Sequence, residues 1–180
     1  MKYIALLRGI NISGKNKISM GELKSELEKK YKNVSTYLNS GNVVFESEIE
    51  DKESIMNDIY EIVKNKFNSE IPVFVMTADE LEDILNHKPE WRWTGNNEIY
   101  DNLIFIISPT EYKEVYGTIW EPKQDIEKIK EYKNSIFWSF DLKNYRKSNW
   151  WVKTASTDIK DRITIRTANT MRKVLEICKG

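Results

Sequence analysis

The strongest constraint on the fold is the order in which strand-like and helix-like patterns follow one another over residues 1–76. Apolar or β-branched runs predict four strands, and apolar residues at three- and four-residue spacing predict two helices between them. The strands are expected at residues 2–7, 34–38, 43–46 and 71–76, and the helices at residues 20–31 and 55–67. The order strand, helix, strand, strand, helix, strand is typical of the ferredoxin-like fold (split βαβ, or α/β plait), an antiparallel sheet with both helices on one face.

Turn and capping residues mark the ends of these elements. Ser19 and Glu22 form a capping box at the start of the first helix. The segment Asn39-Ser40-Gly41-Asn42 contains residue types that tolerate positive φ angles, so it predicts a hairpin between the second and third strands. Pro72 indicates the beginning of the fourth strand, or an edge position.

The remaining chain predicts a second half of similar construction. Thr77 and Glu80 form a capping box for a connecting helix that ends near Pro89, and residues 88–101 are expected to be a loop. Ser108, Pro109 and Glu111 predict an N-cap, a first helical residue and a capping-box glutamate for a helix that ends at Gly117. The other expected elements are a strand at 103–107, a hairpin of 126–130 and 136–140 around Lys133-Asn134, a strand at 163–165 and a last helix through Ile177.

These patterns together predict an α+β protein of two ferredoxin-like halves packed together, each with an antiparallel sheet. The expected organisation is a ferredoxin-like half at residues 1–76, a connecting helix and loop at 77–101, and a second α/β plait-like half with a C-terminal helix at 102–180. With 40% hydrophobic and 31% charged residues, the composition is that of a folded globular chain.

A single cysteine and a single histidine limit the chemistry available to the chain. Cys178 can form no internal disulfide and no multi-thiolate metal site, and its helical spacing from Val174 predicts a buried apolar role. His87 is expected to help cap the C-terminus of the connecting helix, and no His/Asp/Glu cluster has metal-ligand spacing. We expect no cofactor and no metal. The apolar run at residues 3–7 is too short for a signal peptide or a membrane span, which favours a cytoplasmic location.

The charges are distributed unevenly although the net charge is zero. Residues 1–19 contain four bases and no acid, residues 141–180 contain ten bases and four acids, and residues 20–140 contain 14 bases and 24 acids. If the two ends of the chain meet, they form a basic face that favours an anionic partner. Solvated surface charge without a partner is the alternative.

The segment of residues 8–17 carries the most chemical information. It follows a buried strand, precedes a capped helix and holds three cations, two asparagines and two glycines. Such a composition suits a loop that binds an anion through backbone N–H groups and lysine charge. The alternative is a tight turn with solvated lysines. Gly9, Gly14 and Lys15 match the spacing of a phosphate loop, but Asn16 replaces the Ser/Thr that would hold Mg²⁺, and the fold is wrong for that class.

The same segment makes a family resemblance visible. The stretches RGINISGKNKISM and TYLNSGNVVFES resemble the bacterial domain-of-unknown-function family 1697, and the resemblance extends over essentially the full chain. Near the other end, Arg166, Asn169 and Thr170 match the family's closing segment, whereas Thr167 and Ala168 stand where asparagine and tryptophan are usual. The resemblance implies two α/β plait halves and implies no activity.

Two further groups of residues are weaker candidates. Tyr37, Ser40 and Asn42 flank the hairpin turn, where short polar side chains often bond their own backbone. We expect the loop after the first strand and this hairpin to lie at opposite ends of the sheet, which argues against one shared pocket. In the stretch of residues 145–153, basic residues alternate with aromatic ones. Proteins use this composition to contact the phosphates of nucleic acids and to stack on nucleobases. Its candidates are Tyr145, Arg146, Lys147 and Trp150, although tryptophans after a strand are more often buried.

The leading hypothesis is the binding of a small anionic ligand, phosphate- or nucleotide-like, by the loop 8–17. Its candidate residues are Arg8, Asn11, Lys15, Asn16, Lys17, Arg166 and Asn169. If the protein is an enzyme, it would act by positioning and charge stabilisation, because no activated nucleophile is visible. The alternative is a non-catalytic module that binds RNA or single-stranded DNA through residues 145–153, with a steep dependence on salt.

Overall fold

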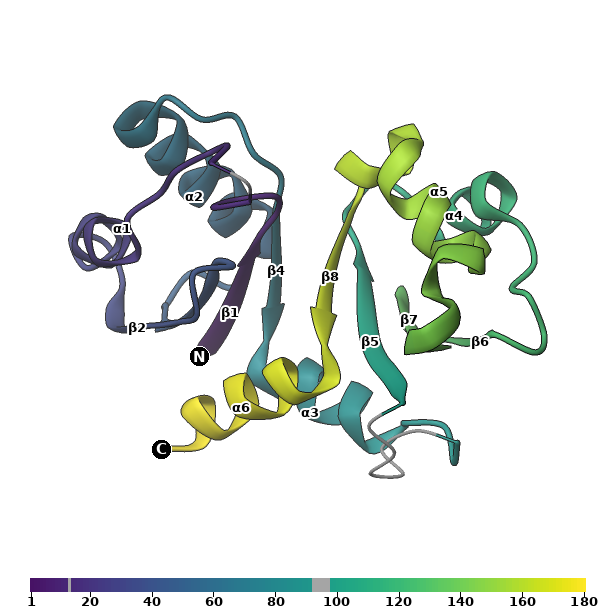
Figure 1. Cartoon of the computed structure of the whole chain (residues 1–180). Helices are drawn as coiled ribbons and strands as arrows, with labels where there is room; N and C mark the ends of the chain where they lie inside the picture. Colours follow the sequence, from purple (N-terminus) through teal and green to yellow (C-terminus); the bar gives the residue numbers. More distant parts are fainter. Residues whose placement is uncertain (13, 92–97) are drawn as a thin grey trace. The chain divides into compact units, whose positions relative to one another are not determined.

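The computed structural model describes residues 1–12, 14–91 and 98–180. Contacts along the chain divide these residues into two compact units, Met1–Glu82 with Lys173–Gly180, and Asp83–Arg172. Each unit contains one four-stranded antiparallel sheet (Figure 1). No helix of the described residues is long and apolar enough to cross a membrane.

The first unit has the predicted ferredoxin-like topology, with the strand order β2-β3-β1-β4. Every neighbouring pair is antiparallel, so β1 and β2, which flank β3, run in the same direction. Its elements are β1 (Lys2–Leu7), α1 (Met20–Leu27), β2 (Lys32–Tyr37), β3 (Asn42–Glu46), α2 (Lys52–Phe67) and β4 (Val73–Thr77). The predicted order and type of all six elements are confirmed.

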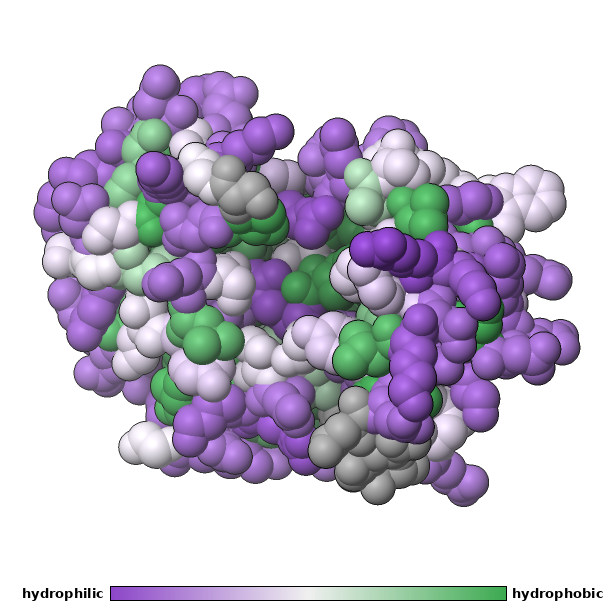
Figure 2. All heavy atoms as spheres, in the orientation of Figure 1, coloured by the Kyte–Doolittle hydropathy of each residue, from purple (hydrophilic) through white to green (hydrophobic). Residues whose placement is uncertain are grey.

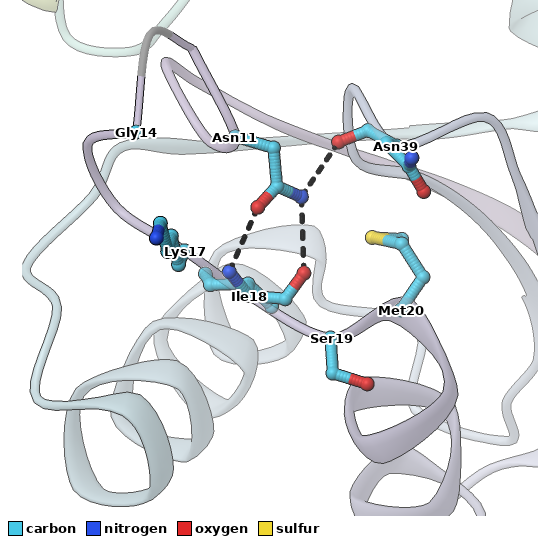
Figure 3. A pocket seen from close by; sticks show the side chains of 7 residues that line it. All are labelled: Asn11, Gly14, Lys17, Ile18, Ser19, Met20 and Asn39. Carbon is cyan, nitrogen blue, oxygen red and sulfur yellow. Dashed lines mark hydrogen bonds between the residues drawn. The ribbon is translucent and has the colours of Figure 1, made fainter.

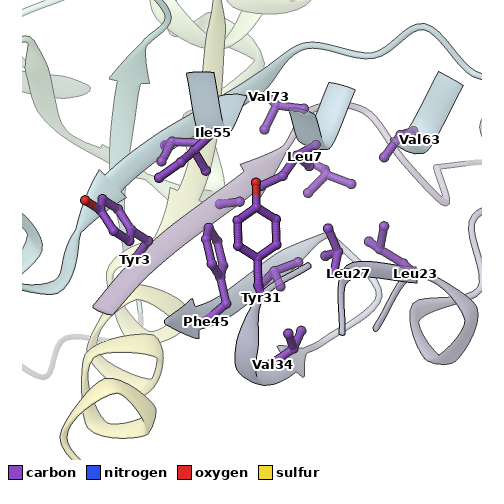
Figure 4. Close-up of a cluster of buried hydrophobic side chains, with 14 of the residues drawn as sticks. Tyr3, Leu7, Leu23, Leu27, Tyr31, Val34, Phe45, Ile55, Val63 and Val73 are labelled. Atoms are coloured by element: carbon purple, nitrogen blue, oxygen red, sulfur yellow. The ribbon is translucent and has the colours of Figure 1, made fainter. Parts of the chain in front are cut away.

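Alternate residues of the first sheet form the core of this unit with both helices. Tyr3 and Leu7 of β1 pack with Leu23 and Leu27 of α1 and with Ile55 of α2 (Figure 4). All five side chains are fully buried, which is the period-two burial expected of a sheet covered on that face by helices. Both helices thus pack against β1 up to its C-terminal residue Leu7, after which the candidate loop begins.

The helix α3 (Ala78–Asn86) follows β4 directly. Its predicted capping box is confirmed, because Thr77 Oγ1 accepts from Glu80 N at 3.1 Å and Glu80 Oε2 accepts from Thr77 N at 2.8 Å. At the other end, the N–H of His87 donates to the carbonyl of Asp83 at 3.2 Å, and a ring nitrogen of His87 lies 2.8 Å from the same carbonyl. These contacts give His87 the capping role expected from its position.

The second unit repeats the topology of the first, with the strand order β6-β7-β5-β8. Alternate residues of β5 and β7 pack with α4 and α5 to form its core, in which Trp138 and Trp150 are almost fully buried. Its elements are β5 (Ile99–Ile106), α4 (Tyr112–Ile119), β6 (Glu127–Tyr132), β7 (Ser135–Asp141), the 3₁₀ helix η1 (Leu142–Lys147), α5 (Asn149–Ser156), the 3₁₀ helix η2 (Asp158–Asp161), β8 (Ile163–Thr167) and α6 (Ala168–Lys179), the last of which continues into the first unit. The chain is therefore an α+β protein with two ferredoxin-like halves.

Two predictions in the second unit were wrong in detail. The helix α4 begins at Tyr112 with Glu111 as N-cap, and Glu111 and Glu114 form the capping box. Ser108 and Pro109 instead lie in a turn that is closed by Thr110 N and Ile107 O at 3.1 Å. The strand β5 begins at Ile99, inside the loop expected at residues 88–101. Residues 92–97 of that predicted loop lie outside the described residues.

Candidate functional site

The connection between β1 and α1 folds back on itself through residues in the left-handed region. Gly9, Asn11, Gly14 and Asn16 have φ angles of 66°, 54°, 80° and 46°. Glycine and asparagine are the residues that adopt this conformation most readily, so the composition of the loop matches its backbone. Within the loop, Asn11 N donates to Asn16 O at 3.1 Å, and Lys15 N donates to Ile12 O at 2.9 Å.

Asn11 uses its whole amide group to hold the loop in place (Figure 3). Its Oδ1 accepts from Ile18 N at 2.9 Å, and its Nδ2 donates to Ile18 O at 3.0 Å and to Asn39 O at 2.9 Å. The side chain therefore joins both ends of the loop and ties it to the turn between β2 and β3. Asn16 has a similar local role, because its Nδ2 donates to Gly9 O at 3.1 Å.

The loop and the hairpin turn lie side by side, and the expectation of opposite sheet ends was wrong. The helical crossover from β1 to β2 makes these two strands parallel. The connections that follow the two strands therefore lie at the same end of the sheet. Leu7 N donates to Gly41 O at 2.8 Å. A Cβ atom added at Gly41 would lie 2.7 Å from Leu7 Cβ and 2.8 Å from Ile10 Cδ1, so only glycine permits this approach.

A pocket of about 440 Å³ lies where the loop, the hairpin turn and the start of α1 meet (Figure 3). Seven residues line it: Asn11, Gly14, Lys17, Ile18, Ser19, Met20 and Asn39. Lys17 is exposed, and no carboxylate of the described residues lies within ion-pair distance of its ammonium. Ser19 Oγ caps the helix by accepting from Glu22 N at 3.3 Å. The pocket thus combines a cation with the N-terminus of a helix.

Backbone donors add to the positive potential of this pocket. Within the part of the chain that the structure describes, the N–H groups of Gly14 and Lys17 donate to no protein acceptor. Such groups attract an anion most strongly where they adjoin a cation and a helix N-terminus. Chemically, the arrangement can hold a small anion such as a phosphoryl group.

The structure distributes the predicted ligand residues over several environments. Asn11 and Lys17 line the pocket, whereas Arg8, Lys15 and Asn16 belong to the same loop without lining it. Arg166 lies in β8 of the second unit, is 7% exposed, and donates to Thr164 Oγ1 and to Ile165 O, both at 2.9 Å.

Asn169 lies in the first turn of α6, where its Oδ1 accepts from Arg172. Thr167 caps this helix by accepting from Thr170 N at 3.1 Å. Thr167 can therefore serve as the N-cap of α6 in place of the asparagine that is usual in the family that the sequence resembles, because both residue types are good N-caps.

The residues around the β2–β3 turn follow ordinary turn chemistry. Asn42 is fully buried, and its Nδ2 donates to Tyr37 O at 2.8 Å and to Ser40 Oγ at 3.1 Å. These bonds fix the hairpin that supports the pocket. Of the turn residues, Asn39 is the one that lines the pocket, and sequence reasoning did not single it out.

The basic aromatic stretch forms η1 and α5. Trp150 is fully buried and its Nε1 donates to Trp120 O at 3.1 Å, so no face of its ring is open to a base. Arg146 and Lys147 are exposed, and Arg146 Nε donates to the hydroxyl of Tyr145 at 2.9 Å. Trp151 is 40% exposed, with its ring centroid 4.9 Å from that of Tyr145.

A buried carboxylate in the second unit was missed by sequence reasoning. Glu127 of β6 is 2% exposed, and its two oxygens accept from Trp138 Nε1 at 3.1 Å, Asn149 N at 2.8 Å, Lys123 N at 3.1 Å and the hydroxyl of Ser148. Because Ser148 is the N-cap of α5, the carboxylate anchors the N-terminus of this helix. It is fully engaged in structural bonds and offers nothing to a ligand.

The remaining titratable groups give little support for catalysis. Cys178 is buried, and burial raises the pKa of its thiol to about 11, which suits the expected apolar role. Asp83 accepts from the Lys133 ammonium at 2.6 Å and from the Tyr132 hydroxyl at 3.0 Å, and Lys133 above all holds the pKa of this carboxyl below its ordinary value. Within the described residues, no group of three or more His, Cys, Asp or Glu side chains could hold a metal ion.

The fold places this chain in the class of α+β proteins with two ferredoxin-like halves. Comparisons with known proteins agree with this architecture. A family model described as "Protein of unknown function (DUF1697)" matches residues 1–137, and the chain belongs to this family. The closing segment around Arg166 lies beyond the matched range. The conserved bacterial protein SP0830 from Streptococcus pneumoniae has a similar structure, with 27% identity, a TM-score of 0.85 and coverage of 98% of this chain and 97% of that chain. No curated protein matches the chain.

Proposed function

We propose that the protein binds a small anionic, phosphate- or nucleotide-like ligand through the loop of residues 8–17. The observation that carries this proposal is the pocket in which Lys17 adjoins the N-terminus of α1 and N–H groups that have no protein acceptor among the residues that the structure describes. A phosphoryl group placed there would accept from the N–H groups of Gly14 and Lys17 and would neutralise the ammonium. The loop needs little rearrangement, because Asn11 already holds it in shape.

Other predicted cations and amides contribute less directly to this proposal. Lys15 is exposed on the same loop and adds long-range attraction for an anion. Arg8 begins the loop, whereas Arg166 and Asn169 belong to the second unit and are not part of the proposed site. Any turnover would rest on positioning and charge stabilisation, since the buried Cys178 is a poor nucleophile. We place this function in the cytoplasm, where a single reduced cysteine is common.

The test is a thermal-shift screen at low salt with nucleotides, phosphorylated metabolites and carboxylates. A ligand at about 100 times its dissociation constant stabilises by about 2.7 kcal/mol, which raises the melting temperature of a chain of this size by about 5–10 °C. A hit should be lost in Lys17→Ala and weakened in Lys15→Ala. Lys128→Ala is the matched control, because it removes an equally exposed lysine from an edge strand of the second unit. Equal shifts in Lys17→Ala and the control would refute the proposal.

A second candidate function is the binding of RNA or single-stranded DNA. It is favoured by the guanidinium of Arg146, 5.5 Å from the Tyr145 ring centroid, and by the exposed Trp151 beside that ring. Arginine and aromatic rings in this arrangement can contact phosphates and stack on bases. This function predicts affinity that falls steeply with salt and is reduced by Trp151→Ala. Trp120→Ala removes a tryptophan that is 67% exposed, and it should leave binding unchanged.

A further inference from the structure

Two exposed aliphatic side chains belong to residues that directly adjoin the pocket lining of the first unit in the chain. Ile12 is 58% exposed and directly follows Asn11, and Leu38 is 52% exposed and directly precedes Asn39. The bond from Asn11 Nδ2 to Asn39 O, at 2.9 Å, brings these two chain segments together. The face of the molecule in Figure 2 is mainly hydrophilic, with apolar side chains in small separate patches. Among the described residues of the first unit, Ile12 and Leu38 are, with Met1, the large hydrophobic side chains that are exposed.

The backbone conformation of Leu38 is unfavourable for a leucine, which is a second reason to ask why this side chain is exposed. Leu38 has a φ angle of 58°, in the left-handed region that asparagine or glycine adopts at lower cost. An asparagine at this position would relieve the backbone and remove an apolar surface from water. The hairpin instead keeps a leucine whose side chain points to solvent, next to Asn39 of the pocket lining.

The pocket itself is apolar on one side. Ile18 and Met20 line it together with Lys17 and Gly14, and Met20 is partly buried at the start of α1. In Figure 3, Met20 lies below Asn39, and Lys17 lies below Gly14. A ligand whose anionic group is bound at Lys17 would therefore have apolar side chains within reach of the rest of its body.

From this juxtaposition we propose that the ligand is a small amphiphile, a phosphate monoester whose alkyl or similarly apolar group contacts Met20, Ile12 and Leu38. The inference rests on the proposed anion binding by the loop and names the chemical class of its ligand. The lysines supply charge complementarity for the phosphate, and the aliphatics supply a surface for the apolar group. Ligand binding would cover the two side chains that are now exposed to water.

The experiment measures dissociation constants by calorimetry for inorganic phosphate, methyl phosphate, butyl phosphate and octyl phosphate, each below its micelle concentration. Each methylene that becomes buried should tighten binding by up to about fourfold. We expect affinity to rise along the series in the wild type. In Leu38→Asn and Ile12→Ser the rise should be reduced at least tenfold for octyl phosphate, while the affinity for inorganic phosphate stays the same. Leu38→Gly provides a second variant that accepts the left-handed backbone.

Matched controls and competing outcomes separate this inference from the proposal beneath it. Leu142→Asn and Val152→Ser remove aliphatics of similar exposure, 47% and 48%, from the second unit and should leave the series unchanged. If all four phosphates bind equally, the amphiphile is refuted while anion binding stands. If none binds, the proposed function itself fails. If the protein binds vesicles of phosphatidylcholine with phosphatidic acid but not octyl phosphate, a membrane surface replaces the small ligand and the inference is overturned.

Discussion

The two ferredoxin-like units share a topology but differ in the connection that follows their first strand. In the first unit this connection comprises residues 8–19, whereas in the second unit it comprises residues 107–111. Both lie beside the hairpin of their own sheet: Leu7 N donates to Gly41 O at 2.8 Å, and Ile106 N donates to Asn134 O at 3.2 Å. The scaffold is thus the same, and the extra residues of the first connection build the candidate site.

The charges at these equivalent places differ as well. The second unit has a pocket of about 320 Å³ beside its short connection, lined in part by Glu114, Asp161 and Arg162. Arg162 is paired there with Glu114 at 3.4 Å and with Asp158 at 2.9 Å. Lys17 has no such acidic partner among the described residues. The comparison shows why we place anion binding in the first unit only: its cation is not neutralised by the protein.

The second helices of the two units are anchored in opposite ways. The N-terminus of α2 is capped by the exposed Asp51, which accepts from Glu53 N at 3.3 Å and from Ser54 N at 3.1 Å. The N-terminus of α5 is held from inside by Glu127 of the neighbouring strand. The longer α2 can rely on its own apolar face, whereas the eight-residue α5 depends on a buried acceptor.

The largest expected effect comes from removing that acceptor. Glu127→Ala should destabilise the second unit by about 3–5 kcal/mol, because several buried donors would lose their partner at once. Urea unfolding followed by tryptophan fluorescence measures this unit, since all six tryptophans of the chain fall within residues 83–172. Glu131→Ala on the exposed part of the same strand is the control and should change stability by less than about 0.5 kcal/mol. A loss below about 1 kcal/mol for Glu127→Ala would contradict the anchoring role.

The close approach of loop and hairpin in the first unit gives the next effect. Gly41→Ala combines a positive φ of 79° with contacts of 2.7 and 2.8 Å to Leu7 and Ile10, and should destabilise by about 2–4 kcal/mol. Gly117→Ala in α4 is a control of opposite sign, because its Cβ meets nothing within 4 Å, and alanine should stabilise the helix by about 0.5–1 kcal/mol. Equilibrium unfolding followed by circular dichroism tests both, and equal effects would show that the packing at Gly41 is unimportant.

The sequence was sufficient for the order of the elements in the first unit because apolar periodicity and capping boxes are local signals. In the second unit it did not predict the helix α5 at Asn149–Ser156. Thr77 with Glu80, and the turn at Lys133-Asn134, were read from neighbouring residues alone. The start of α4 was misplaced because Ser108, Pro109 and Glu111 imitate a capping box three residues too early. That the loop and the hairpin turn lie at the same end of the first sheet could have been deduced, since the crossover between the first two strands makes them parallel.

The site and its supports were harder to predict because they depend on contacts between distant residues. Asn11 was selected as a ligand residue, but its three bonds to Ile18 and Asn39 give it a structural role. Apart from Lys123 N, which is four residues away, the donors to Glu127 lie 11 to 23 residues away along the chain, and no local pattern marks such an acid as buried. Burial of Trp150 was the alternative to base stacking, because tryptophans after a strand are more often buried, and the ring belongs to the same core cluster as residues of α4 and β7.

A smaller effect on stability is expected from the side chain that fixes the connection after β1, which has no counterpart in the prediction for the connection after β5. Asn11→Asp keeps the acceptor for Ile18 N but loses both donors, and should destabilise the first unit by about 1–3 kcal/mol and abolish anion binding. In the second unit, the turn before α4 is closed by the backbone bond from Thr110 N to Ile107 O, so Thr110→Ala should retain the turn. Chemical-shift changes in spectra of the two variants can be mapped to each loop. Unchanged shifts at Ile18 and Asn39 in Asn11→Asp would show that the amide does not hold the loop.

The smallest effect concerns the surface cluster at the hairpin of the second unit. Lys133 lowers the pKa of Asp83, so Lys133→Ala should raise that pKa toward its ordinary value, whereas Lys130→Ala on the same hairpin should not. A depressed carboxyl pKa adds stability that is present above the unfolded pKa and is lost as pH falls through the folded pKa. The stability difference between wild type and Lys133→Ala should therefore exist at neutral pH and disappear in acid. An NMR titration of the Asp83 carboxyl measures the shift, and an unchanged pKa would mean that the exposed pair is fully screened by solvent.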